Sequence, residues 1–381
     1  MLATGKRART IAAAALSSAL LCASSGARGD STTRWPEWDR FVDRFIQADG
    51  RVIDLTFDGK STSEGQSYAL FFALVANDRA RFDTVLEWTS ANLADNRLGE
   101  QLPGWLWGKH DDGHWAIKDR NAAADADLWL AYALLEAGRL WQAPQYDALG
   151  RKVLELVRRH EVAHAGAAGP VLLPGPVGFV LSNDRFRINP SYLPGFMFEY
   201  FAGVDPQGPW SEIWQSYARQ APKIYASGVA PDLYVVSSRG VITQDTERTP
   251  AGSYDAIRVY LWAGMSGEQS RDIVRLLAPF AELIRTLGAP PEKVNPATGT
   301  PLEADFSPVG FVGAALPFLA ALNEDELLRA HVARLAAHTA RARLGATTHY
   351  YDQVLILFGQ GWLDGQYRFD DRGRLQPKWL H

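Results

Sequence analysis

Residues 128–135 read LWLAYALL, and residues 68–76 read YALFFALVA. Neither stretch carries a charged side chain, so a helix formed by either one is apolar on nearly every face. Such a helix belongs in the interior of a protein, where other elements cover all of its sides. Six segments are apolar nearly all round in this way, and we expect them to form inner helices: 63–76, 126–137, 190–202, 254–264, 309–322 and 350–362.

Amphipathic segments rich in charged residues alternate with these apolar segments along the chain. In the last of them, Leu328, Val332 and Leu335 recur at helical spacing among Arg and Glu residues. This pattern is typical of a helix that covers a core with one face. We expect outer helices at 79–92, 146–164, 210–226, 268–287 and 324–342, with a first outer helix near 35–48.

The alternation of outer and inner helices, six times over, predicts a closed ring of helical hairpins, an (α/α)6 barrel in a single domain. Short connections make sequence neighbours antiparallel, so all inner helices run the same way and their N-termini gather at one end. A solenoid of helical repeats is the alternative, although we find no repeat consensus. Residues 228–250, where LYVVSS and GVIT are separated by a turn, predict a small inserted β-hairpin.

Charge and hydropathy exclude two classes of partner. The chain carries a formal net charge of −4, which gives no global attraction to nucleic acid or to an anionic membrane. No apolar run reaches the roughly 20 residues that a membrane-spanning helix needs. We therefore expect no nucleic-acid partner and no insertion into a membrane.

The first residues have the features of an export signal. A basic segment at 6–9 precedes a short apolar run over 11–23, and a small residue follows at Ala27. This order predicts a signal peptide over residues 1–27, followed by one folded domain over 30–381. We expect the mature protein to be a soluble monomer in the periplasm or outside the cell.

The single cysteine, Cys22, lies inside this predicted signal. The mature chain would then have no disulfide and no cysteine that binds a metal. A lipoprotein anchored through Cys22 is the alternative, but Leu21 stands where a small residue is expected before a lipidated cysteine.

Polar residues occur near the N-terminal ends of the expected inner helices. If those ends share one side of the barrel, residues far apart in the sequence converge there. The set comprises Glu64, Asp125, Asp127, Asn189, Tyr192, Asp255, Asp305 and Asp352. Carboxyl groups that face each other across a cleft are suited to glycoside hydrolysis, because one protonates the leaving group while the other activates water or attacks the sugar.

Each acid also has an ordinary structural explanation. Ser61 and Glu64 match the spacing of a capping box. Asp125 suits an N-cap, and Asp255 suits a first helical turn after Ser253, where the helix dipole stabilises an acid. A helix N-terminus lowers the pKa of a carboxyl group, whereas a general acid needs it raised. At Glu64, burial and repulsion by neighbouring carboxylates must therefore outweigh the dipole if it donates a proton.

Three motifs together resemble glycoside hydrolase family 8: SEGQSYAL at 63–70, ADADLWLAYALLEAGRLW at 124–141 and GSYDAIRVYLWAG at 252–264. Within that family, the chain is similar to the periplasmic endoglucanases that accompany bacterial cellulose synthases. The likeness extends over essentially the whole mature chain, including WLWG, NPSYLP and the terminal YYDQVLILFGQGW. The second motif departs from the family pattern at Ala124, usually a hydroxyl residue, and at Leu130, usually Ile or Met.

The resemblance implies an (α/α)6 barrel and an inverting endo-β-1,4-glucanase that hydrolyses cellulose without a cofactor or a metal. It makes Glu64 the proton donor and Asp255 the general base that deprotonates water. It makes Asp125 a catalytic carboxylate, sometimes labelled the nucleophile; because an inverting enzyme forms no covalent intermediate, we expect Asp125 to bind and distort the sugar. Which of Asp125 and Asp255 is the base stays open. The resemblance also implies a role in cellulose synthesis, with the synthase export complex as a partner besides the glucan chain. Xylan, mixed-linkage glucan and chitosan remain alternative substrates, and a non-catalytic polysaccharide-binding protein is the alternative outside the enzymes.

Aromatic and basic residues near these motifs are candidates for sugar binding. Trp105, Trp107 and Tyr192 could stack on the apolar faces of sugar rings, and core packing is the alternative explanation for each. Arg258 lies one helical turn beyond Asp255. It could hold a sugar hydroxyl or orient a carboxylate, and a buried structural ion pair is the alternative.

A second motif suggests a different chemistry. His160, Glu161 and His164 match the zinc-protease pattern, in which two histidines one turn apart bind the metal. The motif falls at the end of an expected outer helix and runs into AGAAGP, without a third ligand at a familiar spacing. The HDDGH stretch at 110–114 could also suggest a metal, but a polar loop explains it equally well. We therefore assign no metal site.

Overall fold

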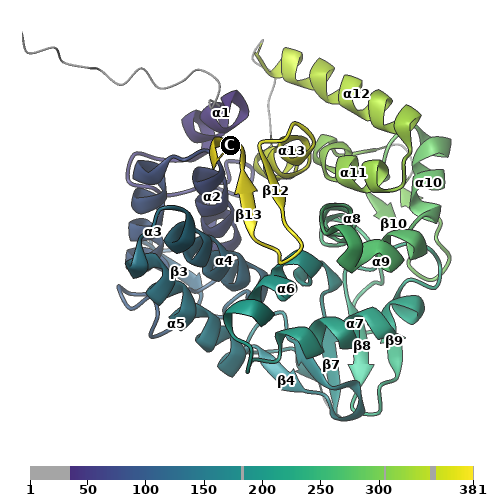
Figure 1. Ribbon diagram of the computed structural model, residues 1–381, viewed down its shortest axis with the longest axis horizontal. Helices are drawn as coiled ribbons and strands as arrows, with labels where there is room; N and C mark the ends of the chain where they lie inside the picture. The colour runs from purple at the N-terminus through teal and green to yellow at the C-terminus, as the bar shows by residue number, and fades with distance from the viewer. Residues whose placement is uncertain (1–34, 182–183, 304–305, 344–348, 381) are drawn as a thin grey trace, which may run out of the picture. The chain divides into compact units, whose positions relative to one another are not determined.

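The computed structural model describes residues 35–181, 184–303, 306–343 and 349–380, and helices dominate these ranges (Figure 1). The expected signal peptide, Cys22 and Asp305 lie outside the described residues. The α-helices are α1 (Pro36–Phe45), α2 (Ser63–Val75), α3 (Arg79–Leu93), α4 (Ala124–Leu140), α5 (Pro144–His160), α6 (Gly195–Val204), α7 (Trp210–Ile224), α8 (Ala256–Met265), α9 (Arg271–Leu276), α10 (Pro279–Leu287), α11 (Val309–Ala321), α12 (Asp325–Arg343) and α13 (Tyr350–Leu363). The 3-10 helices are η1 (Gly166–Ala168), η2 (Pro190–Tyr192), η3 (Gly267–Ser270) and η4 (Lys378–Leu380).

Among the described residues, six helices are buried on most of their faces and form the inner ring: α2, α4, α6, α8, α11 and α13. In α2, every residue except Glu64 is buried. The outer helix α5 instead buries one face, at Tyr146, Gly150, Val153 and Leu154 among others. Around the ring α2 packs on α4, α8 on α11, and α11 on α13 (Figure 1). The (α/α)6 barrel predicted from the alternating pattern is confirmed.

Aromatic side chains from the inner helices meet at the centre of the ring. The rings of Phe72 and Phe358 lie 4.5 Å apart, and Trp129 lies 5.1 Å from Phe358. Helices α11 and α13 approach each other closely, because a Cβ at Gly359 would lie 1.9 Å from the carbonyl oxygen of Gly313. Only glycine fits at this contact. The all-round apolar sequences therefore reflect helices that are covered on every side.

Two expected helices are not continuous in the structure. Residues 268–287 do not form one helix but η3, α9 and α10 in succession. Between α9 and α10, Pro279 has no N–H to continue the hydrogen-bond ladder. Residues 190–202 begin as the 3-10 turn η2, and α6 starts only after Pro194. The prediction of a continuous helix in these two segments was wrong.

The structure contains more strands than the sequence pattern indicated. They are β1 (Ser61–Thr62), β2 (Leu106–Lys109), β3 (Trp115–Asp119), β4 (Val162–His164), β5 (Pro170–Leu172), β6 (Val180–Leu181), β7 (Arg185–Ile188), β8 (Tyr234–Ser237), β9 (Ile242–Gln244), β10 (Lys293–Val294), β11 (Pro301–Glu303), β12 (Tyr367–Phe369) and β13 (Leu375–Pro377). The hairpin expected within 228–250 is confirmed as β8 and β9, with Val236 opposite Ile242. It forms one side of an antiparallel sheet ordered β6-β7-β8-β9. Strands of this length are too short to show an alternating pattern in the sequence.

One small sheet leads into the inner ring. Strand β1 pairs with β2, and β2 pairs with β3, so that Ser61 lies opposite Trp107. Helix α2 begins directly after β1. This sheet therefore fixes the N-terminal end of α2, where Glu64 lies. No helix within the described ranges is long and apolar enough to cross a membrane.

Candidate active site

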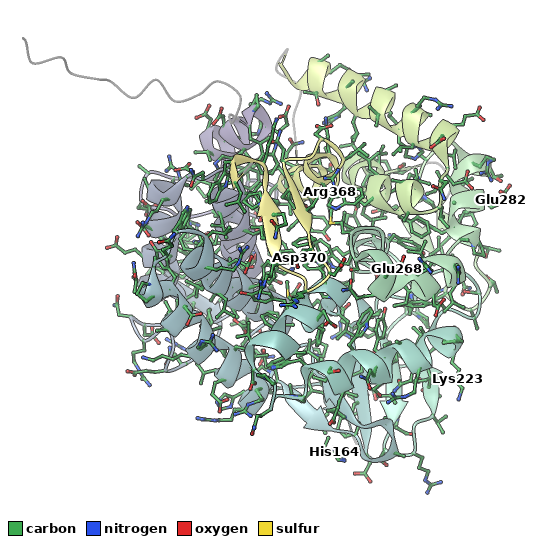
Figure 2. All side chains as sticks on the ribbon, in the orientation of Figure 1. His164, Lys223, Glu268, Glu282, Arg368 and Asp370 are labelled. Carbon is green, nitrogen blue, oxygen red and sulfur yellow. The ribbon has the colours of Figure 1, made fainter. Side chains whose placement is uncertain are left out.

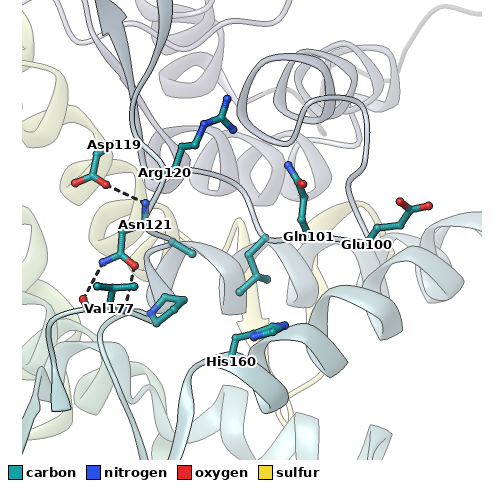
Figure 3. A pocket seen from close by; sticks show the side chains of 10 residues that line it. Glu100, Gln101, Asp119, Arg120, Asn121, His160 and Val177 are labelled. Atoms are coloured by element: carbon teal, nitrogen blue, oxygen red, sulfur yellow. Dashed lines mark hydrogen bonds between the residues drawn. The ribbon is translucent and has the colours of Figure 1, made fainter.

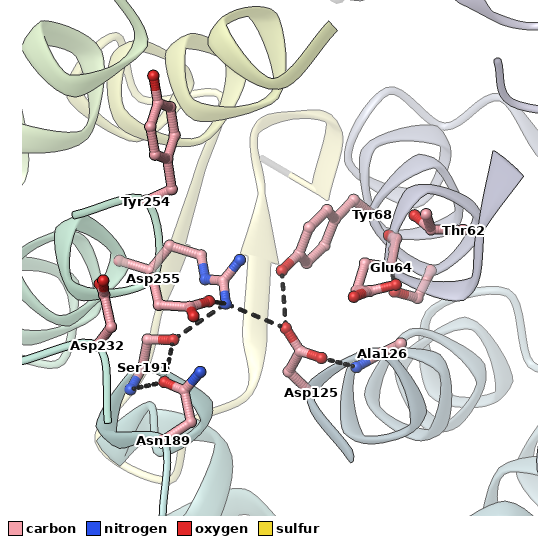
Figure 4. Close-up of polar contacts among 12 residues, drawn as sticks. Thr62, Glu64, Tyr68, Asp125, Ala126, Asn189, Ser191, Asp232, Tyr254 and Asp255 are labelled. Atoms are coloured by element: carbon pink, nitrogen blue, oxygen red, sulfur yellow. Dashed lines mark hydrogen bonds and ion pairs between the residues drawn. The ribbon is translucent and has the colours of Figure 1, made fainter. Parts of the chain in front are cut away.

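Three carboxyl groups from distant parts of the sequence lie at the N-terminal ends of inner helices (Figure 4). Glu64 is in the first turn of α2, Asp125 is in the first turn of α4, and Asp255 is the N-cap residue of α8. The guanidinium of Arg258 lies 2.8 Å from Asp255 and 3.4 Å from Asp125. The structure thus brings together the three acids that the motifs nominate.

Glu64 does not belong to a capping box. Thr62 caps α2, and its hydroxyl accepts the N–H of Gly65 at 3.1 Å. Ser61 lies in β1 and donates its hydroxyl to the carbonyl of Val52 at 2.5 Å. The capping-box explanation for Glu64 was therefore wrong, and its half-buried carboxyl group is free for another role.

Burial raises the pKa of Glu64 from its usual value to about 8, and the negative charge of Asp125 adds to the shift. The charge of Arg258 and hydrogen bonds at the start of α2 lower this pKa but do not reverse the change. Glu64 is consequently protonated at neutral pH. This is the state that a general acid needs, and desolvation outweighs the helix N-terminus here.

Asp125 is almost completely buried, with 3% of its surface exposed. The N-cap of α4 is Ala123, so the N-cap explanation for Asp125 was also wrong. One carboxylate oxygen of Asp125 accepts the N–H of Ala126 at 2.8 Å, and the other accepts the hydroxyl of Tyr68 at 3.5 Å. These contacts fix the orientation of the carboxylate at the start of α4.

Arg258 connects Asp125 with Asp255. From the same nitrogen that contacts both acids, it donates to the hydroxyl of Ser191 at 3.0 Å, and its other terminal nitrogen donates to Tyr351 at 3.2 Å. Burial raises the pKa of Asp125 to about 6, the charge of Arg258 lowers it, and the charge of Asp255 raises it. Arg258 therefore forms the buried ion pair and also orients both carboxylates.

Sequence reasoning missed Asp232. Its carboxylate accepts the N–H of Ser253 at 2.7 Å, the hydroxyl of Ser253 at 2.6 Å and the N–H of Ala256 at 2.8 Å. Asp232 thereby satisfies the start of α8, which leaves the carboxylate of Asp255 to Arg258. Burial raises the pKa of Asp232, and the charge of Asp255 adds to it. No motif surrounds Asp232, so only the three-dimensional contact identifies it.

The NPSY segment supports the same site. Asn189 caps η2 and accepts both the N–H of Ser191 at 3.0 Å and its hydroxyl at 2.7 Å. Tyr192 hydrogen-bonds to Asp125, and its ring lies 5.7 Å from the guanidinium of Arg258. Tyr192 is half-buried and lies against the carboxylate of Asp125.

The backbone of Trp105 is hydrogen-bonded to the two segments that carry Glu64 and Asp125. Its carbonyl accepts the N–H of Ser63, next to Glu64, at 3.0 Å. Its N–H donates to the carbonyl of Asn121, just before α4, at 2.8 Å. The indole is half-buried. Trp105 therefore stands beside the segments that carry Glu64 and Asp125.

Trp107 is enclosed by its neighbours. The guanidinium of Arg51 lies 4.2 Å from its ring, Trp88 contacts it edge-on at 5.3 Å, and Trp115 stacks on it at 4.9 Å. Arg51 also lies 4.5 Å from Trp115, whose side chain is 41% exposed. Trp115 is the most exposed ring of this cluster. The sequence did not single it out, because β3 contains no motif.

Two other acids of the expected set have different surroundings. Asp352 accepts the N–H of Gly310 at 2.8 Å and so stabilises the start of α11. Asp127 is fully buried in the first turn of α4, next to Glu161. Neither acid is joined to the network around Arg258.

The zinc-like motif does not lie on a single helix. Helix α5 ends at His160, so the expected helix over 146–164 is too long, and His164 belongs to strand β4 (Figure 2). Glu161 is fully buried between them. Within the described part of the chain, no three His, Cys, Asp or Glu side chains are grouped to hold a metal. In the 110–114 loop, Asp112 pairs with His114.

A surface pocket of about 630 Å³ lies between the end of β3 and the end of α5 (Figure 3). The side-chain amide of Asn121 closes one edge, because it donates to the carbonyl of Val177 at 3.0 Å and accepts its N–H at 3.2 Å. The lining residues include none of the three acids. We therefore assign the candidate chemistry to the acids around Arg258.

The comparisons with known proteins agree with this geometry. The family profile described as glycosyl hydrolases family 8 matches residues 11–365. The chain belongs to glycoside hydrolase family 8. It is 47% identical over 365 residues to an endoglucanase of Xanthomonas axonopodis pv. citri, a match that covers 95% of this chain and 94% of that protein. It is 41% identical over 349 residues to an endoglucanase of Escherichia coli K12, with 91% of each covered.

Solved structures give the same result. The crystal structure of endo-1,4-D-glucanase from Vibrio fischeri ES114 matches with a TM-score of 0.81 and 38% identity, and it covers 91% of this chain and 100% of that chain. The endo-β-1,4-glucanase CMCax from Acetobacter xylinum matches with a TM-score of 0.68 at 24% identity, over 85% and 96% of the two chains, which shows the shared fold alone. The family expected from the three motifs is confirmed. The chain is a glycoside hydrolase.

Proposed function

We propose that this family 8 hydrolase is an endo-β-1,4-glucanase, which cleaves internal bonds of cellulose by an inverting acid/base mechanism. The observation that carries the proposal is Glu64, whose pKa is raised to about 8 by burial and by the charge of Asp125. A carboxyl group that holds its proton beside carboxylates is the arrangement that glycoside hydrolysis needs. The endoglucanase names of relatives matched over more than nine-tenths of their length support a glucan as the substrate.

In this proposal Glu64 is the proton donor. It gives its proton to the glycosidic oxygen as the bond to the anomeric carbon breaks, so the departing sugar leaves as a neutral alcohol. The protonated state at neutral pH and the partial exposure of the side chain both suit a group that contacts substrate.

Asp255 is the proposed general base. Its side chain is 39% exposed, whereas that of Asp125 is 3% exposed, so water has better access to Asp255. Asp255 takes one proton from a water molecule, and the water oxygen forms the new bond to the anomeric carbon on the side opposite the leaving group. The carboxyls supply both proton transfers, so the proposal includes no cofactor or metal.

Asp125 is the proposed positioning group for the sugar next to the cleaved bond. Arg258, Tyr68 and the start of α4 hold its carboxylate in one orientation. A buried, fixed carboxylate can hydrogen-bond to sugar hydroxyls and favour a distorted ring on the way to the transition state. Its burial disfavours a role in which it must bind a freely exchanging water.

Aromatic residues provide the proposed contacts to the rest of the glucan chain. Trp105 and Tyr192 stand beside the acids and are half-buried. Trp107 stacks on one face of Trp115, and the exposed ring of Trp115 offers a flat apolar surface to a sugar ring. The sheet that holds Trp115 continues into the start of α2. We therefore propose that a long chain bound at Glu64 extends onto Trp115.

We also propose an extracytoplasmic role. The basic and apolar pattern of residues 1–27 supports export to the periplasm or beyond as a monomer, and the family resemblance supports a function with the cellulose synthase export complex. N-terminal sequencing of the mature protein should begin close to Arg28, within the stretch that ends at Ser31. An intact Met1 or a lipid on Cys22 would contradict this proposal.

A reducing-sugar assay tests the substrate and the site together. Wild type, Glu64→Gln and the control Glu87→Gln, at an exposed residue of α3, should be compared on carboxymethylcellulose, xylan and chitosan. We expect wild type and the control to release reducing ends fastest from carboxymethylcellulose, and Glu64→Gln to release almost none. Faster release from xylan or chitosan would mean that this polysaccharide, and not cellulose, is the preferred substrate. Equal activity in Glu64→Gln would remove Glu64 from the mechanism, and no activity of wild type on any polysaccharide would favour a non-catalytic binding protein.

A further inference from the structure

Two buried acids have no part in the proposed mechanism. Asp127 is the second acid of the 124–141 motif, and Glu161 is the central residue of the zinc-like motif. Asp127 lies in the first turn of α4, and Glu161 is the C-cap residue of the adjacent helix α5. Both side chains are 0% exposed. Such complete burial is unusual, because carboxylates are rarely buried without a cation or a hydrogen-bond donor as partner.

The two carboxyl groups are partners for each other. No donor from the described residues reaches any of the four carboxyl oxygens of Asp127 and Glu161. The two groups themselves lie within hydrogen-bonding reach. Two ionised carboxylates this close and out of water repel each other strongly. A single proton converts the repulsion into a charge-assisted O–H···O⁻ hydrogen bond.

The surroundings of the pair are acidic. Burial raises the pKa of both Asp127 and Glu161 well above its usual value. The charge of Asp125 on α4 raises the pKa of Asp127 further, and so does the charge of Glu64 on α2 once Glu64 loses its proton. The charges of Asp127 and Asp125 raise the pKa of Glu161. This electrostatic coupling is mutual, so a negative charge on the pair also raises the pKa of Asp125 and Glu64.

We propose that Asp127 and Glu161 share one proton and act as a positioning pair, which fixes the first turn of α4 against the end of α5 and holds one buried negative charge near Asp125 and Glu64. The pair contacts no substrate in this proposal. It acts through the two acids at the site, and so it rests on the roles proposed for Glu64 and Asp125. It also explains why Glu161 is buried although it binds no metal.

The first test measures the shared proton and needs no enzyme activity. The unfolding equilibrium of wild type, the double variant Asp127→Asn/Glu161→Gln and the surface control Glu87→Gln should be measured against pH. Above about pH 5 the unfolded chain releases a proton that the folded pair retains, so rising pH favours unfolding of wild type. The ratio of the unfolding constants of wild type and double variant should grow about tenfold for each pH unit from 5 to 7. A ratio independent of pH would overturn the shared proton.

The second test measures kcat/KM against pH on carboxymethylcellulose. The double variant has lost the negative charge, so the pKa of Glu64 should fall and the alkaline limb should move to lower pH, by about half a unit or more. In Asp127→Asn and in Glu161→Gln, one carboxylate remains and is hydrogen-bonded to the new amide. Because the negative charge is retained, the alkaline limb should stay in place. A uniform loss of rate without movement of the limb would show a merely structural pair and overturn the positioning role. Absence of glucanase activity in wild type would instead refute the proposed function and leave the first test valid.

Discussion

Arg258 on α8 and Asp125 on α4 form a buried ion pair between two inner helices, with 3.4 Å between nitrogen and oxygen. Their side chains are 9% and 3% exposed, so water screens the attraction only weakly. The charge of Arg258 keeps the carboxyl group of Asp125 mostly ionised at neutral pH, although burial raises its pKa. Glu64, which lacks such a partner, keeps its proton. This difference between two neighbouring acids is the electrostatic basis of the proposed mechanism.

Replacing Arg258 with Gln should therefore shift the acid limb of kcat/KM. Burial would still raise the pKa of Asp125, but the positive charge that lowers it would be gone. If turnover requires an ionised Asp125, the limb moves to higher pH and activity near pH 6 falls. The surface variant Arg275→Gln on α9 serves as the control. An unmoved acid limb in Arg258→Gln would mean that this ion pair does not set the ionisation of Asp125.

Glu64→Gln should separate catalysis from folding. It cannot donate a proton, so kcat should fall by roughly 10²–10⁴-fold, while binding of cello-oligosaccharides measured by calorimetry is retained. The folded-state pKa of Glu64 is about 8, above its value in the unfolded chain, so wild type loses stability as pH rises between these values. The variant lacks this loss. Its stability advantage should grow from about pH 5 to pH 8 and then level off, and an advantage that does not change with pH would contradict the raised pKa.

The two aspartates should respond differently to azide. Asp255→Asn loses the base, and azide can attack the sugar without one, so azide should restore part of the lost rate. Asp125→Asn should also lower kcat, but azide should not restore it if the residue positions the sugar. The measurement is the rate of glycosyl azide formation in each variant. Rescue of Asp125→Asn alone would show that the two roles are exchanged.

Trp115→Ala should weaken binding of long chains. An aromatic contact contributes about 0.5–1.5 kcal/mol, which corresponds to a rise in KM of roughly 2- to 12-fold on a long soluble glucan. The kcat should change little, because Trp115 lies on strand β3 and takes no part in the proton transfers of the three acids. Val241→Ala, at another exposed apolar side chain, is the matched control. An equal KM for Trp115→Ala and the control would exclude Trp115 from the binding surface.

The fold was predictable because its signal is long and repeated. In an inner helix such as α2, the run from residue 68 to residue 75 is apolar on every face, and no surface element of a monomer has that composition. The break at Pro279 and the late start of α6 were missed, because the charged and apolar patterns continue across both. Strands such as β1, with two residues, leave no pattern that could be read.

The site was predictable only in part. The motifs nominate Glu64, Asp125 and Asp255, but the capping alternatives for the first two could be removed only when the structure assigned the caps to Thr62 and Ala123. The contact of Asp232 with the start of α8 joins segments that have no common motif. Likewise, the pairing of Asp127 with Glu161 depends on the packing of α4 on α5 and left no signal in the local sequence.

The configuration of the first product tests the central claim most directly. If Glu64 protonates the leaving oxygen while Asp255 directs water to the opposite side, hydrolysis of a β-1,4-linked chain must release the α-anomer. Proton NMR of cellopentaose hydrolysis, recorded before the anomers equilibrate, distinguishes the two configurations. The account predicts that the α-anomer appears first. Initial release of the β-anomer would mean retention through a covalent glycosyl-enzyme and would contradict the account.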